Sequence, residues 1–269
     1  MGKNLILRIV VAIFGIPALI YICVKGGFFL LGFTILLAVV GGAEISMMLS
    51  AKGYRSSLFL SVLLPLVFVV CAFYGYEVLD LLTITIFIHT IIIVIDYSRA
   101  KDLKLTEFPA DFLGRLLPVF YVGLLSSYII RLSKDFTIGG YLLILVFMVV
   151  WASDTAAYFG GKLMGKHKLS ETVSPKKTWE GFYFGFLGAL IAAVVAKLVF
   201  LNLDWIKVIV LALAACLFGQ IGDLFESAIK RHCGVKDSSA ILPGHGGILD
   251  RFDSFLFAVP IVYLILLVW

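Results

Sequence analysis

A chain of 269 residues in which 62% are hydrophobic and only 14% are charged cannot hide its apolar side chains in one water-soluble core, because a soluble domain has about a quarter of its residues charged. Lipid must therefore be the solvent for much of the molecule, as the mean hydropathy of +1.09 also indicates. The net charge of +5 does not point to nucleic acid as a partner, since the basic residues fall in loops that would face anionic lipid head groups.

Unbroken apolar runs of about 17 to 24 residues, long enough to cross the hydrocarbon layer, follow one another along the chain. Strands of a membrane barrel would instead show segments of about ten residues with alternating polarity. The sequence therefore predicts an all-α fold, a polytopic integral membrane helical bundle with about nine transmembrane helices. The predicted spans are Leu5–Val24, Gly26–Leu49, Leu58–Tyr74, Val78–Ile95, Phe112–Ile130, Tyr141–Gly161, Phe182–Leu201, Ile206–Ile229 and Phe252–Trp269.

Lysine and arginine are distributed unevenly between the two ends of these spans. With the N-terminus in the cytoplasm, 17 of the 22 basic residues fall on the cytoplasmic side, which is the side that such residues prefer. The polar loops 162–180 and 230–251 then face the cytoplasm, and the C-terminus lies on the opposite side. In a bacterium we expect this protein in the cytoplasmic (inner) membrane.

The chain changes character near residue 140. Residues 1–140 are nearly pure hydrophobic spans with short loops and predict a scaffold, whereas residues 141–269 carry intramembrane acids and clusters of Gly, Lys and Asp. An acid in the hydrocarbon layer costs about 2.5 kcal/mol or more, so its presence there indicates function. We therefore expect the catalytic site in the second part.

The eighth span ends in a group of polar residues. They are Asp223, Glu226, Ser227 and Lys230. Their positions i, i+3, i+4 and i+7 place them on one side of a helix. The alternative is an internal ion pair that only fixes helix packing.

Two further spans bring acids to a similar depth. Asp154 lies seven residues before the end of the sixth span, about 10 Å below the surface at the helical rise, and the ninth span begins near Asp250 and Asp253 at the same side. This convergence predicts a buried polar cavity. Carboxylates grouped without cysteine or paired histidine suit a hard cation such as Mg²⁺.

Lys176 and Lys177 stand directly before the seventh span, and Thr178 is suited to cap its helix. The free N–H groups and the dipole at a helix N-terminus attract anions, so this segment predicts a phosphate site. The alternative, an ordinary basic cluster beside the membrane, stays open on these residues alone.

The segment from Ser227 to Asp253 is dense in charged residues and glycine. Within it, Gly246 and Gly247 follow His245 and provide a backbone that can approach a phosphate closely. The segment resembles the signature of the phosphatidate cytidylyltransferase family. Upstream, the residues that are similar to the same family are Ser153, Asp154, Tyr158, Gly161, Lys162, Gly165, Lys166 and Val173 to Thr178. The resemblance covers residues 150 to 260, with Ser239 standing where a glycine is expected.

The resemblance implies an enzyme of phospholipid biosynthesis that transfers the cytidylyl group of CTP to phosphatidate, giving CDP-diacylglycerol and pyrophosphate. It implies in-line attack of the lipid phosphate on the α-phosphorus of CTP, Mg²⁺ with or without a second cation, and a homodimer among membrane lipids. The candidate catalytic residues are Asp223, Asp250, Asp154, Lys230, Arg231, His245 and Arg251. The candidate residues for binding CTP and its phosphates are Lys176, Lys177, Lys236, Ser227, Gly246 and Gly247. The candidate metal ligands are Asp223 and Asp250 first, then Asp154, Asp253 and Asp237.

Three other classes of membrane protein also bury acids in helices. A CTP-dependent polyprenol or phytol kinase, the nearest rival, would release CDP rather than pyrophosphate. A CDP-alcohol phosphotransferase needs Asp-Gly, Ala-Arg and further Asp residues within one stretch, a pattern that this chain lacks. An ion-coupled transporter usually places its acids near the membrane midplane between repeated halves, whereas here the acids lie near one face and no repeat is visible.

Overall fold

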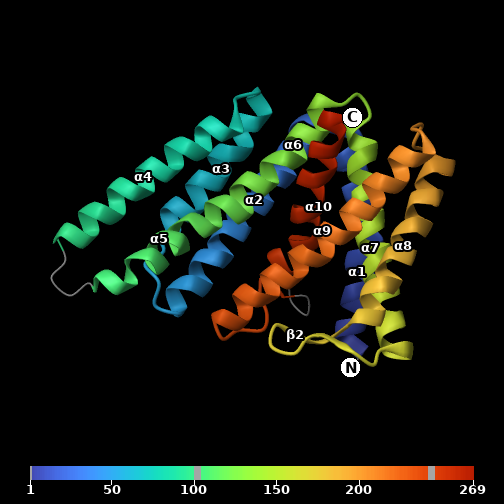
Figure 1. Ribbon diagram of the computed structural model, residues 1–269. Coiled ribbons are helices and arrows are strands. Elements are labelled where there is room, and N and C mark those ends of the chain that lie inside the picture. Colours follow the sequence, from blue (N-terminus) through green and yellow to red (C-terminus); the bar gives the residue numbers. More distant parts are fainter. Residues whose placement is uncertain (1, 100–103, 242–245) are drawn as a thin grey trace.

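The computed structural model describes residues 2–99, 104–241 and 246–269, and for residues 2–12 it describes the backbone alone. Figure 1 shows a bundle of helices, as predicted, with one short hairpin at one end. The α-helices are α1 (Gly2–Lys25), α2 (Gly27–Ala51), α3 (Leu58–Tyr74), α4 (Val78–Arg99), α5 (Phe108–Leu117), α6 (Leu125–Asp135), α7 (Gly139–Met164), α8 (Trp179–Val199), α9 (Trp205–His232) and α10 (Leu249–Val268). The other elements are the 3₁₀ turn η1 (Leu105–Glu107), the π-helix η2 (Pro118–Leu124) and the strands β1 (Lys168–Ser170) and β2 (Ser174–Thr178).

The helices have the lengths and the surface of a membrane bundle. Seven helical stretches of the described chain are long and apolar enough to cross a membrane, and two shorter apolar helices, Ile13–Lys25 and Leu58–Tyr74, accompany them. One of the seven is Leu105–Asp135, in which η1, α5, η2 and α6 run on from one another. Phe14 and Phe28 are 72% and 76% exposed, which suits side chains that contact lipid. The predicted all-α polytopic fold is confirmed.

Individual residues explain where several helices begin, where they end and where one becomes a π-helix. Ser57 caps α3, because its Oγ accepts a hydrogen bond from the Leu60 N–H at 3.4 Å. Gly75 ends α3 in a left-handed conformation with φ of 84°, which glycine adopts without strain. The π-helix η2 begins at Pro118, whose ring has no N–H to continue the helical ladder.

Helices α7 and α8 lie side by side and approach closely through small residues. A Cβ atom on Gly181 would lie 2.7 Å from the backbone oxygen of Ala157, and one on Gly185 would lie 2.8 Å from Ser153 Oγ. Glycine at these positions removes the side chains that would hold the helices apart. Thr178 caps α8 as predicted, because its Oγ1 accepts a hydrogen bond from the Gly181 N–H at 3.1 Å.

The polar loop 162–180 contains an antiparallel hairpin that the sequence analysis did not predict. Its paired residues are Lys168 with Thr178 and Ser170 with Ser174. Glu180 fixes the base of the hairpin, since its Oε1 lies 2.7 Å from His167 Nδ1. The hairpin therefore starts and ends against the first turn of α8.

The polar loops gather at one end of the bundle. Figure 1 shows the hairpin and the end of α9 at the end of the bundle where α1 starts, while α10 finishes at the opposite end. This arrangement places loop 162–180 and the described parts of loop 230–251 (230–241 and 246–251) on the same side, as predicted. That this side faces the cytoplasm stays a prediction.

Candidate active site

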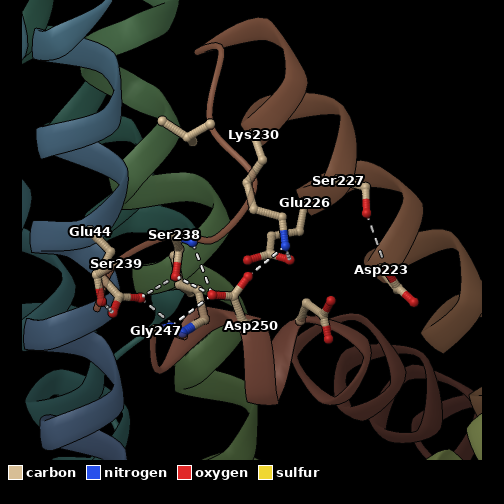
Figure 2. A network of polar contacts seen from close by, with 12 residues as sticks. Glu44, Asp223, Glu226, Ser227, Lys230, Ser238, Ser239, Gly247 and Asp250 are labelled. Carbon is tan, nitrogen blue, oxygen red and sulfur yellow. Dashed lines mark hydrogen bonds and ion pairs between the residues drawn. The ribbon is translucent and has the colours of Figure 1, made fainter. Parts of the chain in front are cut away.

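The last turns of α9 carry the polar face that the sequence predicts. Ser227 Oγ donates a hydrogen bond to Asp223 Oδ1 at 3.3 Å, and Lys230 Nζ donates to Glu226 Oε2 at 2.5 Å. Both pairs are spaced i, i+4, so both partners project from the same side of the helix. Figure 2 shows Lys230 and Glu226 directed at Asp250, while Ser227 and Asp223 form a separate pair farther along the helix.

Lys230 joins α9 to α10. Its Nζ also donates to Asp250 Oδ1 at 2.6 Å, so one ammonium contacts two carboxylates. The side chains of Lys230 and Glu226 are 10% and 0% exposed, and at such burial a charge needs a partner. An ammonium has three N–H donors, so one is left for a substrate oxygen after these two contacts.

The other oxygen of Asp250 is held by the loop that precedes α10. Asp250 Oδ2 accepts hydrogen bonds from the Gly247 N–H at 2.7 Å, from the Ser238 N–H at 2.9 Å and from Ser238 Oγ at 3.0 Å. Gly246 has a φ of 84°, and a Cβ atom there would lie 2.6 Å from Asp250 Oδ2. Both glycines thus approach a carboxylate in this structure, and their contact with a phosphate stays a prediction.

The sequence analysis missed Glu44, which belongs to the same network. Glu44 lies in α2 and is 0% exposed. Its donors are Ser238 Oγ (3.0 Å), Ser239 Oγ (2.6 Å), the Ile248 N–H (2.9 Å) and the Leu249 N–H (2.9 Å). An acid inside an apolar run is the signal that identified Asp154, but Glu44 lies in the part of the chain predicted to be scaffold.

A cavity of about 470 Å³ is formed by the hairpin together with α7, α8 and α9. Asp154 and Asp223 line it together with Lys176 and Lys177, and Lys177 Nζ lies 2.5 Å from Asp223 Oδ2. The remaining lining residues are Ala157, Tyr158, Gly161, Lys162, Leu169, Thr178, Gly181, Phe182 and Gln220. The acids of two of the three expected helices thus meet at one cavity, whereas Asp250 and Asp253 of α10 are not among its lining residues.

Acids outnumber the ammonium groups that pair with them in this region. Asp253 lies within electrostatic range of Asp223 and Glu226, and its carboxyl group is close enough to that of Glu226 to form a hydrogen bond with it when one of the two carries a proton. The five acids are Asp154, Asp223, Glu226, Asp250 and Asp253, whereas the ammonium groups in their described ion pairs are those of Lys177 and Lys230. A cation held among these carboxylates would reduce the repulsion between them.

The structure describes three of the four remaining residues that were predicted to contact phosphates. Arg231 is exposed and donates its Nη1 to the backbone oxygen of Val235 at 3.0 Å. Lys236 and Arg251 are also exposed. His245 lies outside the described residues. The assignment of all four as phosphate donors stays a prediction.

A larger cavity, of about 670 Å³, is formed by residues of α2, α4, α5, η2 and α9. Its lining is apolar apart from Tyr54 and His232, whose Oη and Nε2 lie 2.6 Å apart. No acid contributes to this lining among the residues that the structure describes. The polar chemistry therefore belongs to the smaller cavity.

Comparison with known proteins shows which family the whole chain resembles. The profile of the cytidylyltransferase family matches residues 6–269. A protein named phosphatidate cytidylyltransferase from Staphylococcus epidermidis is 36% identical over 266 residues, which cover 97% of this chain and 98% of that protein. Proteins of the same name from Staphylococcus saprophyticus and Staphylococcus aureus are 36% identical over 261 and 263 residues, with the same coverage. The resemblance found in residues 150 to 260 thus extends through the N-terminal spans.

Proposed function

The chain belongs to the cytidylyltransferase family and is an enzyme, and on this premise we propose that it transfers the cytidylyl group of CTP to phosphatidate, giving CDP-diacylglycerol and pyrophosphate. The observation that carries the proposal is the cavity in which Asp154 and Asp223 meet Lys176 and Lys177. Lysines can hold the phosphates of a nucleotide, and acids can hold the cation that accompanies it. The cavity thus suits a polyanionic substrate.

The position of the cavity also suits a lipid substrate. Its walls are the ends of membrane-spanning helices, and Tyr158 and Phe182 line it beside the charged groups. A lipid can keep its acyl chains in the bilayer while its phosphate enters such a cavity. CTP would enter from the hairpin side, which we expect to face the cytoplasm.

The reaction needs one displacement at phosphorus. An oxygen of the phosphatidate phosphate forms a bond to the α-phosphorus of CTP, and the bond from that phosphorus to the bridging oxygen breaks. The electron pair of the broken bond leaves with pyrophosphate. The protein's task is to align the two substrates and to neutralise charge, and Lys176 and Lys177 lie where they can contact the departing phosphates.

The acids fit a magnesium ion that the substrate helps to hold. Among the described residues no three acidic, histidine or cysteine side chains lie close enough to enclose a metal. Mg²⁺ commonly takes only one or two carboxylates and completes its shell with phosphates and water, so the separated carboxylates of this region are enough to hold it together with a nucleotide. Asp223 and Asp250 are the ligands that we propose first. Asp154 and Asp253 are the second choice. The ion would neutralise the nucleotide phosphates.

The fate of the phosphates of CTP tests this proposal. Purified protein in micelles is given phosphatidate and Mg²⁺ with CTP labelled either at the α- or at the γ-phosphate. We expect the α label in the lipid product and the γ label in pyrophosphate. A γ label in the lipid with the α label in CDP would identify a lipid kinase and refute the proposal, and a transporter would leave CTP intact.

Two substitutions on α9 form a matched pair for this assay. Asp223→Asn keeps the volume of the side chain and removes its charge, and we expect it to lower turnover at least about 100-fold. Asp204→Asn alters an exposed acid at the other end of the helix that makes no cap hydrogen bond, so its activity should stay within about twofold. Near-normal activity of Asp223→Asn with unchanged magnesium dependence would remove this residue from the metal site.

A further inference from the structure

The carboxylate of Glu44 clamps the loop that closes on Asp250. Among the described residues its partners are neutral, namely two hydroxyls at one end of the loop and two backbone N–H groups at the other. The N–H groups belong to Ile248 and Leu249, at the start of α10, where the helix dipole also favours an anion. A carboxylate at this burial is costly without such donors. Glu44 in α2 therefore holds both ends of the loop between α9 and α10, about 200 residues later in the chain.

Ser238 connects the clamp to Asp250. Its Oγ lies 3.0 Å from Glu44 Oε2 and 3.0 Å from Asp250 Oδ2, and a hydroxyl has a single proton to donate. The carboxylates of Glu44 and Asp250 therefore share the single proton of this hydroxyl as acceptors, so a change at one alters the hydrogen bond to the other. Ser239 donates to Glu44 Oε1 at 2.6 Å, and its described contacts do not include Asp250.

We propose that Glu44 is a positioning residue that sets the place of Asp250 through Ser238, and with it the affinity of the site for a divalent cation. The inference rests on the proposed function, in which Asp250 helps to hold the cation. All three donors to Asp250 Oδ2 lie on the clamped loop, so release of the clamp frees this carboxylate to move. Hydrogen-bond partners that orient a metal ligand typically change metal affinity or activity about 10- to 100-fold when they are removed.

A purely structural role for Glu44 makes a different forecast. Ser238 and Ser239 each donate one hydroxyl hydrogen bond to the same carboxylate. If Glu44 only holds α2 against the loop, Glu44→Gln leaves the Mn²⁺ affinity unchanged, and only Ser238→Ala lowers it, because Ser238 itself contacts Asp250. If Glu44 acts through Ser238, Glu44→Gln and Ser238→Ala both lower this affinity. Ser239→Ala, which removes the other hydroxyl, is the matched control for Ser238→Ala.

The test compares Glu44→Gln, Ser238→Ala and Ser239→Ala in the purified full-length protein. Binding of Mn²⁺ is measured by electron paramagnetic resonance with and without CTP, and kcat and KM are measured for both substrates. We expect Glu44→Gln and Ser238→Ala to raise the Mn²⁺ dissociation constant about 10-fold or more and to lower kcat, with the KM for phosphatidate within about twofold. Ser239→Ala should stay within about twofold of wild type in Mn²⁺ affinity.

The double variant adds a check, because the effects of substituting two residues that act through one contact do not add. Glu44→Gln with Ser238→Ala should be little worse than Glu44→Gln alone. If Glu44→Gln does not fold, as judged by size exclusion and circular dichroism, Glu44→Asp, which keeps the charge and shortens the side chain, takes its place and should also raise the Mn²⁺ dissociation constant.

The possible outcomes separate this inference from the proposed function. An unchanged Mn²⁺ affinity in Glu44→Gln, or equal affinities in Ser238→Ala and Ser239→Ala, overturns the positioning role, even when the wild type makes CDP-diacylglycerol. If the variants show the expected shifts in Mn²⁺ affinity but the wild type transfers no cytidylyl group, the positioning role stands and the proposed function is refuted. Wild-type protein that binds no Mn²⁺ in either condition overturns the inference whatever its activity.

Discussion

Lys230→Met keeps the length of the side chain and removes its charge, so it isolates the ammonium that joins α9 to α10. In the wild type this ammonium lies 2.5 Å from Glu226 Oε2 and 2.6 Å from Asp250 Oδ1. Asp250 keeps its donors from the loop in the variant. Glu226 is fully buried, and in the variant it loses the ammonium that compensates its charge.

The expected loss of stability follows from this burial. At 2.5 Å and an effective dielectric constant of about 20, the contact between Lys230 and Glu226 is worth about 6–7 kcal/mol of attraction. The cost of taking the ammonium out of water offsets part of this attraction. Removal of one partner from a buried pair typically costs about 3–5 kcal/mol, and we expect Lys230→Met to lower the free energy of unfolding by that amount. Adding Glu226→Gln removes the stranded charge and should restore most of it.

Unfolding in mixed micelles with a rising fraction of sodium dodecyl sulfate, followed by circular dichroism, measures these differences. Lys168→Met, an exposed position on β1, serves as the control and should change the free energy of unfolding by less than about 0.5 kcal/mol. The reasoning is refuted if Lys230→Met stays within about 1 kcal/mol of wild type. It also fails if Glu226→Gln in the same chain restores nothing.

Three further outcomes test the loop, the orientation and one thiol. Gly247→Ala should lower activity at least about tenfold and destabilise the protein by about 1–3 kcal/mol, because its Cβ would overlap the Ser238 hydroxyl and the Glu44 carboxylate. Gly32→Ala is the control and should match wild type in both assays, because there is open space around this position. A cysteine introduced by Glu171→Cys, in the exposed turn of the hairpin, should react with a membrane-impermeant thiol reagent from the cytoplasmic side alone, and labelling from outside intact cells would overturn the orientation. Cys233 should react from the same side but more slowly than the cysteine introduced at position 171, because burial raises the pKa of its thiol. Its labelling rate should rise with pH as more thiolate forms, and a rate that does not change with pH would contradict this.

Patterns that depend on neighbours in the sequence predicted much of the fold and part of the site. The polar face of α9 follows from helical periodicity alone, since its residues lie within about two turns of one helix. Thr178 caps α8 because capping joins residues three positions apart. The meeting of Asp154 with Asp223 at one cavity follows from two spans that carry acids at a similar depth below the same end of the bundle.

Contacts between distant parts of the chain could not be predicted in this way. Glu44 and its donors are separated by 194 to 205 residues, and no local pattern joins them. The hairpin pairs short polar strands, which show no alternation of apolar residues to indicate a strand. The predicted span Phe112–Ile130 runs through Pro118 without a break, and whether a proline gives a kink or a π-helix depends on the packing around it.

Helix α8 has one side that packs closely against α7 and another side that is exposed, and the two sides need different kinds of residue. Gly185 and Gly188 lie against α7, whereas Leu187 and Leu198 are 53% and 71% exposed to the surroundings. Because the contact runs through backbone and small side chains, the spacing of the two helices does not depend on which apolar residues cover the exposed side. That side can therefore be remodelled to suit a thicker or thinner bilayer while Asp154 keeps its place on α7.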